Sequence, residues 1–197
     1  MSVTNSTAHK TTSFAEPLKQ VIEQAKSGNE QAMHQLYKLY GRAMLNTAFR
    51  ILNNAEDAED VLQESFINIF TKLNQYNYQS SFGAWVKRIV VNRSIDELKK
   101  KRRKSLLNDE NGVPVTEIET FNSNGEVDQK VQLDLLYKAL HALPDGYRTV
   151  FSLYMLEGYD HHEISEILDI GVSTSISQLS RAKQKLRSLT VKFQHHG

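Results

Sequence analysis

The stretch FGAWVKRIVVNRSIDELKKKRRK, residues 82–104, has the pattern of one long helix with apolar and aromatic residues on one side and basic residues on the other. Residues 87–104 hold nine Lys or Arg against two acids, a local charge of +7 (9 − 2) in a chain of formal net charge +1. DNA affinity depends on local clusters of cations that displace counterions, so a near-neutral total is compatible with DNA binding. The stretch therefore predicts a helical surface for nucleic acid.

The composition limits the class of protein. A chain of 197 residues with 40 % hydrophobic content can form one medium domain or two small ones. The absence of cysteine excludes disulfide scaffolds and thiolate metal sites and suits a reducing cytoplasm. No apolar run reaches the roughly 18 residues of a membrane span, and the polar N-terminus does not resemble a signal peptide. The low counts of three Pro and nine Gly predict an all-α protein. Because the chain lacks cysteine, a membrane span and a signal peptide, we also expect it to be cytoplasmic and not inserted in a membrane.

Changes in composition divide the chain into four parts. Residues 1–14 are rich in Ser and Thr and predict a disordered tail, and residues 15–104 predict a first domain of four helices. Residues 105–130 predict a flexible acidic linker, because seven acids oppose one lysine between residues 105 and 134. Residues 131–192 resume the helical period and predict a second helical domain.

Polar residues at the starts of the periodic segments predict helix caps. Asn29 and Asn54 precede the second and third helices, the third covering about residues 55–74, and Ser80 or Ser81 precedes the fourth. Ser173 is the predicted cap of the last helix.

The segment EISEILDIGVSTSISQLSRAKQKLRSL, residues 163–189, predicts two helices joined by a tight turn that contains Gly171, which fits a helix-turn-helix. A recognition helix needs small polar residues near the bases and cations behind them for phosphates. The candidate residues for duplex DNA are Ser173, Thr174, Ser177, Gln178, Arg181 and Lys185. The alternative is a solvated helix in a three-helix bundle.

The segment NAEDAEDVLQE, residues 54–64, holds five acids and no base. The helix macrodipole accounts for the acids of the first turn. Asp60, Gln63 and Glu64 lie at i, i+3 and i+4, so they share one face that could bind a basic surface of a protein partner. A carboxylate metal site is the less favoured alternative, because no histidines cluster nearby.

Aromatic and basic residues alternate in the loop 74–81 and the helix after it. Single-stranded nucleic acid needs rings for base stacking and cations along the backbone. The candidate residues are Tyr76, Asn77, Tyr78, Trp85, Lys87, Arg88, Asn92 and Arg93. Phe82 and Trp85, at i and i+3, fit core positions equally well.

Catalytic and metal motifs are missing from the sequence. His161 and His162 do not form HExxH, and neighbours on a helix point about 100° apart, so a shared metal is disfavoured. No phosphate-binding glycine loop and no nucleophile elbow occur. We therefore expect no enzyme, no cofactor and no metal.

The order of these parts resembles bacterial RNA polymerase sigma factors of the extracytoplasmic-function group. DAEDVLQESFINIFTKL is similar to region 2.2 of that family, and residues 82–103 are similar to regions 2.3 and 2.4. The segment from LPDGYRTVF to RAKQKLR, residues 143–187, is similar to region 4. The resemblance covers nearly the whole chain after residue 15.

The resemblance implies a function for each surface. Asp60, Gln63 and Glu64 match positions that bind the clamp helices of the largest polymerase subunit. The loop 76–81 and Asn92 with its basic neighbours match the surface that holds an extruded base of the minus-10 element, and trapping that base compensates its unstacking cost of a few kcal/mol. The recognition helix would bind the minus-35 element as duplex. Proteins of this group are often held inactive by an anti-sigma factor, so such a partner is implied too.

One departure from the family concerns the recognition helix. Many members have basic residues where this chain has Ile176 and Gln178, which predicts weaker phosphate anchoring by the second domain. Ile176 is expected to be partly buried, since Ser175 occupies a position that is usually apolar.

Two other functions fit parts of the sequence. A stand-alone helix-turn-helix regulator would bind duplex DNA without polymerase. A helical interaction module with a basic face for solubility would show no salt-dependent DNA binding.

Overall fold

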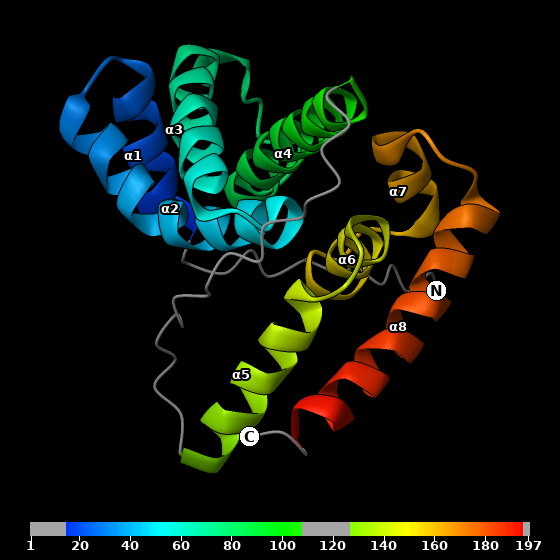
Figure 1. The fold of residues 1–197 in the computed structure, drawn as a ribbon. Helices are drawn as coiled ribbons and strands as arrows, with labels where there is room; N and C mark the ends of the chain where they lie inside the picture. The colour runs from blue at the N-terminus through cyan, green and yellow to red at the C-terminus, as the bar shows by residue number, and fades with distance from the viewer. Residues whose placement is uncertain (1–14, 108–126, 195–197) are drawn as a thin grey trace, which may run out of the picture.

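The computed structural model describes residues 15–107 and 127–194, and helices make up most of both parts (Figure 1). No strand occurs within these two ranges, which confirms the predicted all-α class. The predicted tail, residues 1–14, and most of the predicted linker, residues 105–130, lie outside the described residues.

The first unit contains four α-helices built around the second of them. The helices are α1 (Ala15–Lys26), α2 (Glu30–Leu52), α3 (Ala55–Thr71) and α4 (Phe82–Leu107). A 3₁₀ turn, η1 (Leu73–Gln75), follows α3, so the third helix ends earlier than predicted. Helix α2 packs against the other three helices, and its fully buried residues Leu36, Ala48 and Ile51 form the centre of the core.

Local capping explains where these helices begin. Asn29 Oδ1 accepts a hydrogen bond from Ala32 N at 3.0 Å, and Asn54 Oδ1 accepts one from Asp57 N at 3.0 Å. Of the two candidate serines before α4, Ser81 is the cap, because its Oγ accepts from Ala84 N at 3.2 Å. The three predicted caps of the first unit are confirmed.

The second unit begins earlier than predicted, with α5 (Val127–His141). Helix α6 (Asp145–Phe151) follows and continues into a π-helical turn, η2 (Ser152–Leu156). Helices α7 (His161–Leu168) and α8 (Val172–Gln194) form the predicted helix-turn-helix.

The predicted cap at Ser173 is wrong. Helix α8 begins at Val172, so Ser173 lies inside its first turn, and Ser175 N donates to Gly171 O at 3.0 Å. The left-handed backbone at Asp169 (φ 57°) ends α7, and after this tight turn the next helix starts two residues earlier than predicted.

The two units lie against each other. Helix α6 contacts α2, and α7 contacts α4 (Figure 1). Val150, Leu153 and Ile164 of the second unit belong to the same buried apolar cluster as the core of the first. The sequence predicted two domains but gave no sign of this contact.

His141, at the end of α5, lies in the contact between the units. Its ring is 4.7 Å from the ring of Phe49 and pairs with the side chain of Asn53, and Asn53 Nδ2 donates to its carbonyl at 3.2 Å. Burial lowers the pKa of His141 to about 4, and the positive charges of Arg148 and Arg50 add to this effect. His141 is therefore neutral in the folded protein at neutral pH.

We predict that this histidine makes the folded protein less stable in mild acid. An ordinary histidine pKa is 6.5, so between pH 6.5 and about 4 the unfolded chain binds a proton that the folded chain excludes. The contribution of His141 is complete above pH 6.5 and is lost as the pH falls towards 4, by about 1–2 kcal/mol between pH 7 and pH 5. Urea unfolding at both pH values should show a smaller loss for His141→Gln than for wild type or for the exposed control His162→Gln. An equal loss in all three would contradict the assignment.

Candidate polymerase and nucleic-acid interfaces

The acidic face of α3 is exposed. Asp60, Gln63 and Glu64 all face solvent, whereas the intervening Val61 and Leu62 are buried in the core. The spacing therefore places the three predicted partner-binding residues on one face, and their role stays a prediction.

Glu64 is bound to a residue from another predicted site. Arg93 of α4 donates to Glu64 Oε2 through Nε at 2.9 Å and also through Nη2. Both side chains are half-exposed, so this ion pair is worth little and can be exchanged for another partner. A groove between α3 and α4 is lined there by Glu64, Asn68 and Thr71 on one side and Ile89, Asn92 and Arg93 on the other.

Tyr76 forms the floor of the loop before α4. It is only 5 % exposed, its hydroxyl donates to Ser80 O at 2.7 Å, and its ring lies 5.4 Å from that of Trp85. Tyr76 was predicted to contact DNA, but in this arrangement it supports the exposed loop residues Asn77 and Tyr78 from below.

Tyr78 is held by two residues of α1 that sequence analysis missed. Its hydroxyl donates to the carboxylate of Glu23, and the Lys26 ammonium lies 4.7 Å from its ring centroid. Lys26 also donates to Glu23 Oε1 at 3.0 Å and to Tyr76 O at 3.1 Å. In sequence, Glu23 and Lys26 signal only an ordinary i,i+3 ion pair on α1.

The contact between Tyr78 and Glu23 shifts the pKa of both side chains. Burial raises the pKa of Tyr78, and its hydrogen bond to Glu23 raises it further. That hydrogen bond, followed by the one from Lys26, lowers the pKa of Glu23. At neutral pH the phenol therefore donates to a charged carboxylate. This contact helps to hold Tyr78 in a left-handed conformation, φ 63°, that a bulky residue rarely adopts.

The basic residues of α4 are divided between solvent and protein contacts. Arg88 and Asn92 are exposed and Trp85 is half-buried. Lys87, however, faces the second unit, and its Nζ donates to Glu157 O at 2.6 Å. Of the predicted cations for single-stranded DNA, Lys87 and Arg93 are thus bound to carboxylate-bearing residues, whereas Arg88 faces solvent.

The recognition-helix candidates lie on α8. All are exposed except Gln178, which is half-buried beside Gly146. The expectation that Ile176 is partly buried is wrong, because its side chain is 52 % exposed. Ser175 is fully buried instead, and its Oγ lies 2.8 Å from His161 Nδ1, so a hydrogen bond replaces the usual apolar contact.

Neither a metal centre nor a membrane span is found in residues 15–107 and 127–194. No group of three or more His, Cys, Asp or Glu in these ranges could hold a metal ion. No helix there has both the length and the apolar character to cross a bilayer. His161 is stacked on Tyr154 with 4.5 Å between the ring centroids, which gives it a structural role.

Comparison with protein families places both units. Residues 36–104 match the model of Sigma-70 region 2, and residues 133–186 match Sigma-70, region 4. The chain is 32 % identical over 179 residues to the ECF RNA polymerase sigma factor SigW of Bacillus subtilis, covering 86 % of this chain and 95 % of SigW. The chain belongs to the extracytoplasmic-function (ECF) sigma factor family.

Further similarities agree with this assignment. The ECF RNA polymerase sigma-E factor of Escherichia coli K12 is 27 % identical over 176 residues, covering 84 % of this sigma factor and 90 % of sigma-E. The fold resembles that of the sigma factor RpoE of Bartonella quintana in complex with the anti-sigma factor NepR, with a TM-score of 0.58, 24 % identity and coverage of 79 % and 94 % of the two chains. CnrH in complex with the cytosolic domain of CnrY gives a TM-score of 0.50 at 25 % identity, covering 87 % of this chain and 95 % of CnrH.

Membership assigns the two units to regions 2 and 4 of a sigma factor. Sigma factors are transcription initiation factors that bind the RNA polymerase core and promoter DNA. Helices α3 and α4 lie within the region 2 match, and the helix-turn-helix lies within the region 4 match. The resemblance inferred from sequence is therefore confirmed.

We predict that loss of the Tyr78 hydroxyl loosens the loop before α4. Trp85 is the only tryptophan and contacts Tyr76 in this loop, so its fluorescence reports the packing there. Tyr78→Phe keeps the ring but removes the bond to Glu23, so the loop should become only slightly less stable, because the carboxylate is exposed to solvent. Trp85 emission should shift to longer wavelength and acrylamide quenching should rise.

Glu23→Gln should have the same effect on Trp85, whereas Glu30→Gln, at the start of α2, is the control. Unchanged quenching in both Tyr78→Phe and Glu23→Gln would show that α1 does not hold the loop.

Proposed function

We propose that this sigma factor divides its work among three exposed surfaces. The acidic face of α3 binds the polymerase core, the loop 76–81 with α4 holds the opened minus-10 strand, and the N-terminal half of α8 binds the minus-35 duplex. The observation that carries the proposal is that α3 and α4 pack against each other and present faces of opposite charge side by side. Partners of opposite charge, protein and nucleic acid, can then be bound at the same time.

The proposed minus-10 surface consists of the loop 76–81 and the polar groove between α3 and α4. Tyr78 is exposed above the buried Tyr76, and Asn92 lies in the groove between α3 and α4. An extruded base could stack on an aromatic ring while Asn92 supplies hydrogen-bonding groups for its edge. The exposed cation Arg88, with Arg93, would bind the phosphates. Binding energy of this kind would favour the opened strand over the duplex.

The Glu64–Arg93 ion pair joins the core-binding and DNA-binding surfaces. Each residue is half-exposed, so each can exchange its partner at low cost. Core binding at Glu64 would release Arg93 for a phosphate. This coupling would favour DNA binding by the assembled polymerase over binding by the free subunit.

An anti-sigma factor is part of the proposal, together with action in the cytoplasm, where polymerase is found. Support comes from two similar solved structures, the sigma factor RpoE in complex with the anti-sigma factor NepR and CnrH in complex with the cytosolic domain of CnrY. The inhibitor of this chain would have to cover surfaces in both regions to block both DNA contacts.

We predict that charge changes on α3 and α4 separate core binding from DNA binding. Arg88→Gln combined with Arg93→Gln should weaken binding of the polymerase complex to a single-stranded minus-10 oligonucleotide. The plot of the logarithm of the DNA association constant against the logarithm of the salt concentration should also become less steep by about 1.4, because two phosphate contacts at about 0.7 each are lost. Asp60→Asn combined with Gln63→Ala should instead weaken core binding about tenfold, as expected for loss of hydrogen bonds with a charged partner.

Fluorescence anisotropy with core polymerase and with the oligonucleotide measures both affinities. Lys72→Gln, an exposed cation outside α4, is the control, and Arg88→Gln alone leaves the pair with Glu64 intact. Equal losses of core and DNA binding in both double variants would contradict the division of labour.

A further inference from the structure

Helix α1 carries a row of charged side chains beside the loop before α4. The match to Sigma-70 region 2 begins at residue 36, so α1 lies outside the part of the chain that the family model describes. Ile22 and Ala25 of α1 are buried, and the helix packs against α2 and the turn η1. The charged residues Lys19, Glu23 and Lys26, at i, i+4 and i+7, share the face that meets the loop. A helix outside the family match therefore borders the proposed minus-10 surface.

Two cations of α1 lie close to the exposed ring of Tyr78. The ammonium of Lys26 is 4.7 Å from the ring centroid, and that of Lys19 is 5.6 Å from it. Lys26 is engaged within the protein, because it donates to Glu23 Oε1 at 3.0 Å and to Tyr76 O at 3.1 Å, and its side chain is only 16 % exposed. Lys19 is exposed, and its contact with the ring is weak enough to be exchanged. Lys19 is therefore the cation of α1 that a phosphate can reach.

The carboxylate of Glu23 keeps hydrogen-bonding capacity for a ligand. The Tyr78 hydroxyl and the Lys26 ammonium both donate to the same oxygen, Oε1. An ionised carboxylate can accept about four hydrogen bonds through its two oxygens. The Glu23 side chain is 54 % exposed, and the two bonds lower its pKa, so it is charged at neutral pH. A ligand that lies against Tyr78 thus meets a charged hydrogen-bond acceptor.

Such an acceptor distinguishes bases by the groups on their edges. A pyrimidine ring and a phenol ring are similar in size, so a base stacked on Tyr78 places one edge near the phenol oxygen and near Glu23. Cytosine and adenine carry an amino group that donates to a carboxylate, whereas thymine carries the carbonyl oxygen O4, which a carboxylate repels. The chemistry of Glu23 therefore suits a base with an amino group.

We propose that α1 adds a nucleotide subsite to the minus-10 surface, in which Glu23 selects the base and Lys19 binds a neighbouring phosphate. The subsite takes a nucleotide of the opened strand and favours cytosine or adenine over thymine. Tyr78 supports the base, and Lys26 holds the carboxylate in place. The subsite rests on the proposed function, because a base must be extruded at the loop 76–81 to reach it.

One change in the protein combined with one change in the DNA tests the role of Glu23. The complex of the full-length chain with core polymerase is titrated by fluorescence anisotropy with oligodeoxycytidine and with oligodeoxyuridine of equal length. These probes differ in whether ring position 4 carries an amino group or a carbonyl. Glu23→Gln should lower the ratio of the two association constants about fivefold, because an amide can bind either group.

Tyr78→Phe is the matched control for this change. It removes the same hydrogen bond between the loop and α1 but keeps the carboxylate of Glu23. It should weaken binding of both oligonucleotides by the same factor and leave the preference for cytosine intact. A role of Glu23 in holding the loop would affect both probes alike, whereas selection of the base changes their ratio.

The salt dependence of binding tests Lys19. Lys19→Gln should make the plot of the logarithm of the association constant against the logarithm of the salt concentration less steep by about 0.7, because one phosphate contact is lost. The preference for cytosine should not change. Lys38→Gln, which removes an exposed cation of α2, is the control and should alter neither quantity.

The outcomes separate the subsite from the proposed function. An equal ratio of association constants in wild type and Glu23→Gln would overturn base selection, and so would an equal loss of preference in Tyr78→Phe. An unchanged salt dependence in Lys19→Gln would overturn the phosphate contact. In each of these cases the opened strand is still bound and the proposed minus-10 surface stands. Failure of the wild-type complex to bind either oligonucleotide would instead contradict that surface, and the subsite with it.

Discussion

The C-terminal turn of α2 is the point on which the arrangement of the structure depends. A helix end leaves carbonyls without intrahelical donors, and in the interior of a protein these must find other partners. Here Asn53 N donates to Phe49 O within the cap, and Arg148 of region 4 donates to the next two carbonyls. Helix α2 also packs against α1, α3 and α4, so one helix organises region 2 and receives region 4.

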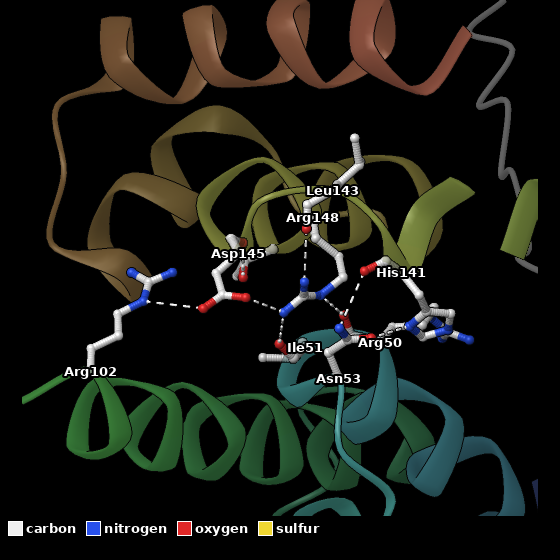
Figure 2. A network of polar contacts seen from close by, with 9 residues as sticks. Arg50, Ile51, Asn53, Arg102, His141, Leu143, Asp145 and Arg148 are labelled. Carbon is white, nitrogen blue, oxygen red and sulfur yellow. Dashed lines mark hydrogen bonds and ion pairs between the residues drawn. The ribbon is translucent and has the colours of Figure 1, made fainter. Parts of the chain in front are cut away.

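The polar character of this contact has a physical consequence. An interface made only of apolar residues would resemble a permanent core, whereas charged groups that lose water on closing regain it on opening. The buried apolar core of region 2 also continues into region 4 through Val150, Leu153 and Ile164. The contact between the regions thus combines a buried polar network, part of which Figure 2 shows, with apolar packing.

Two basic side chains that are predicted to contact DNA are bound to acids within the protein. Arg93 pairs with Glu64, and Lys87 contacts Glu157. A cation with an internal partner must exchange that partner for a phosphate, so these pairs would lower the affinity for DNA if the two cations contact it as proposed. The exposed Glu64 pair is easily exchanged, and the buried Glu157 contact is the stronger restraint.

The sequence by itself determined the features that depend on neighbours along the chain. Helix periods, the caps Asn29, Asn54 and Ser81, and the spacing that exposes Asp60, Gln63 and Glu64 follow from interactions over three or four residues, which local patterns record. The predicted start of α8 was wrong by two residues, because both Gly171 and Ser173 are acceptable near a helix start and only the turn geometry at Asp169 distinguishes them.

Only the tertiary structure decided which of these residues meet. Glu157 and Arg50 are 107 residues apart, and Tyr78 and Glu23 are 55 apart, and neither pair leaves a periodic trace in the sequence. The burial of Tyr76 and the exposure of Ile176 likewise depend on what packs above them, since an aromatic or aliphatic side chain suits either a core or a surface contact. Local physics defines each helix, whereas long-range packing determines which charges remain available for a partner.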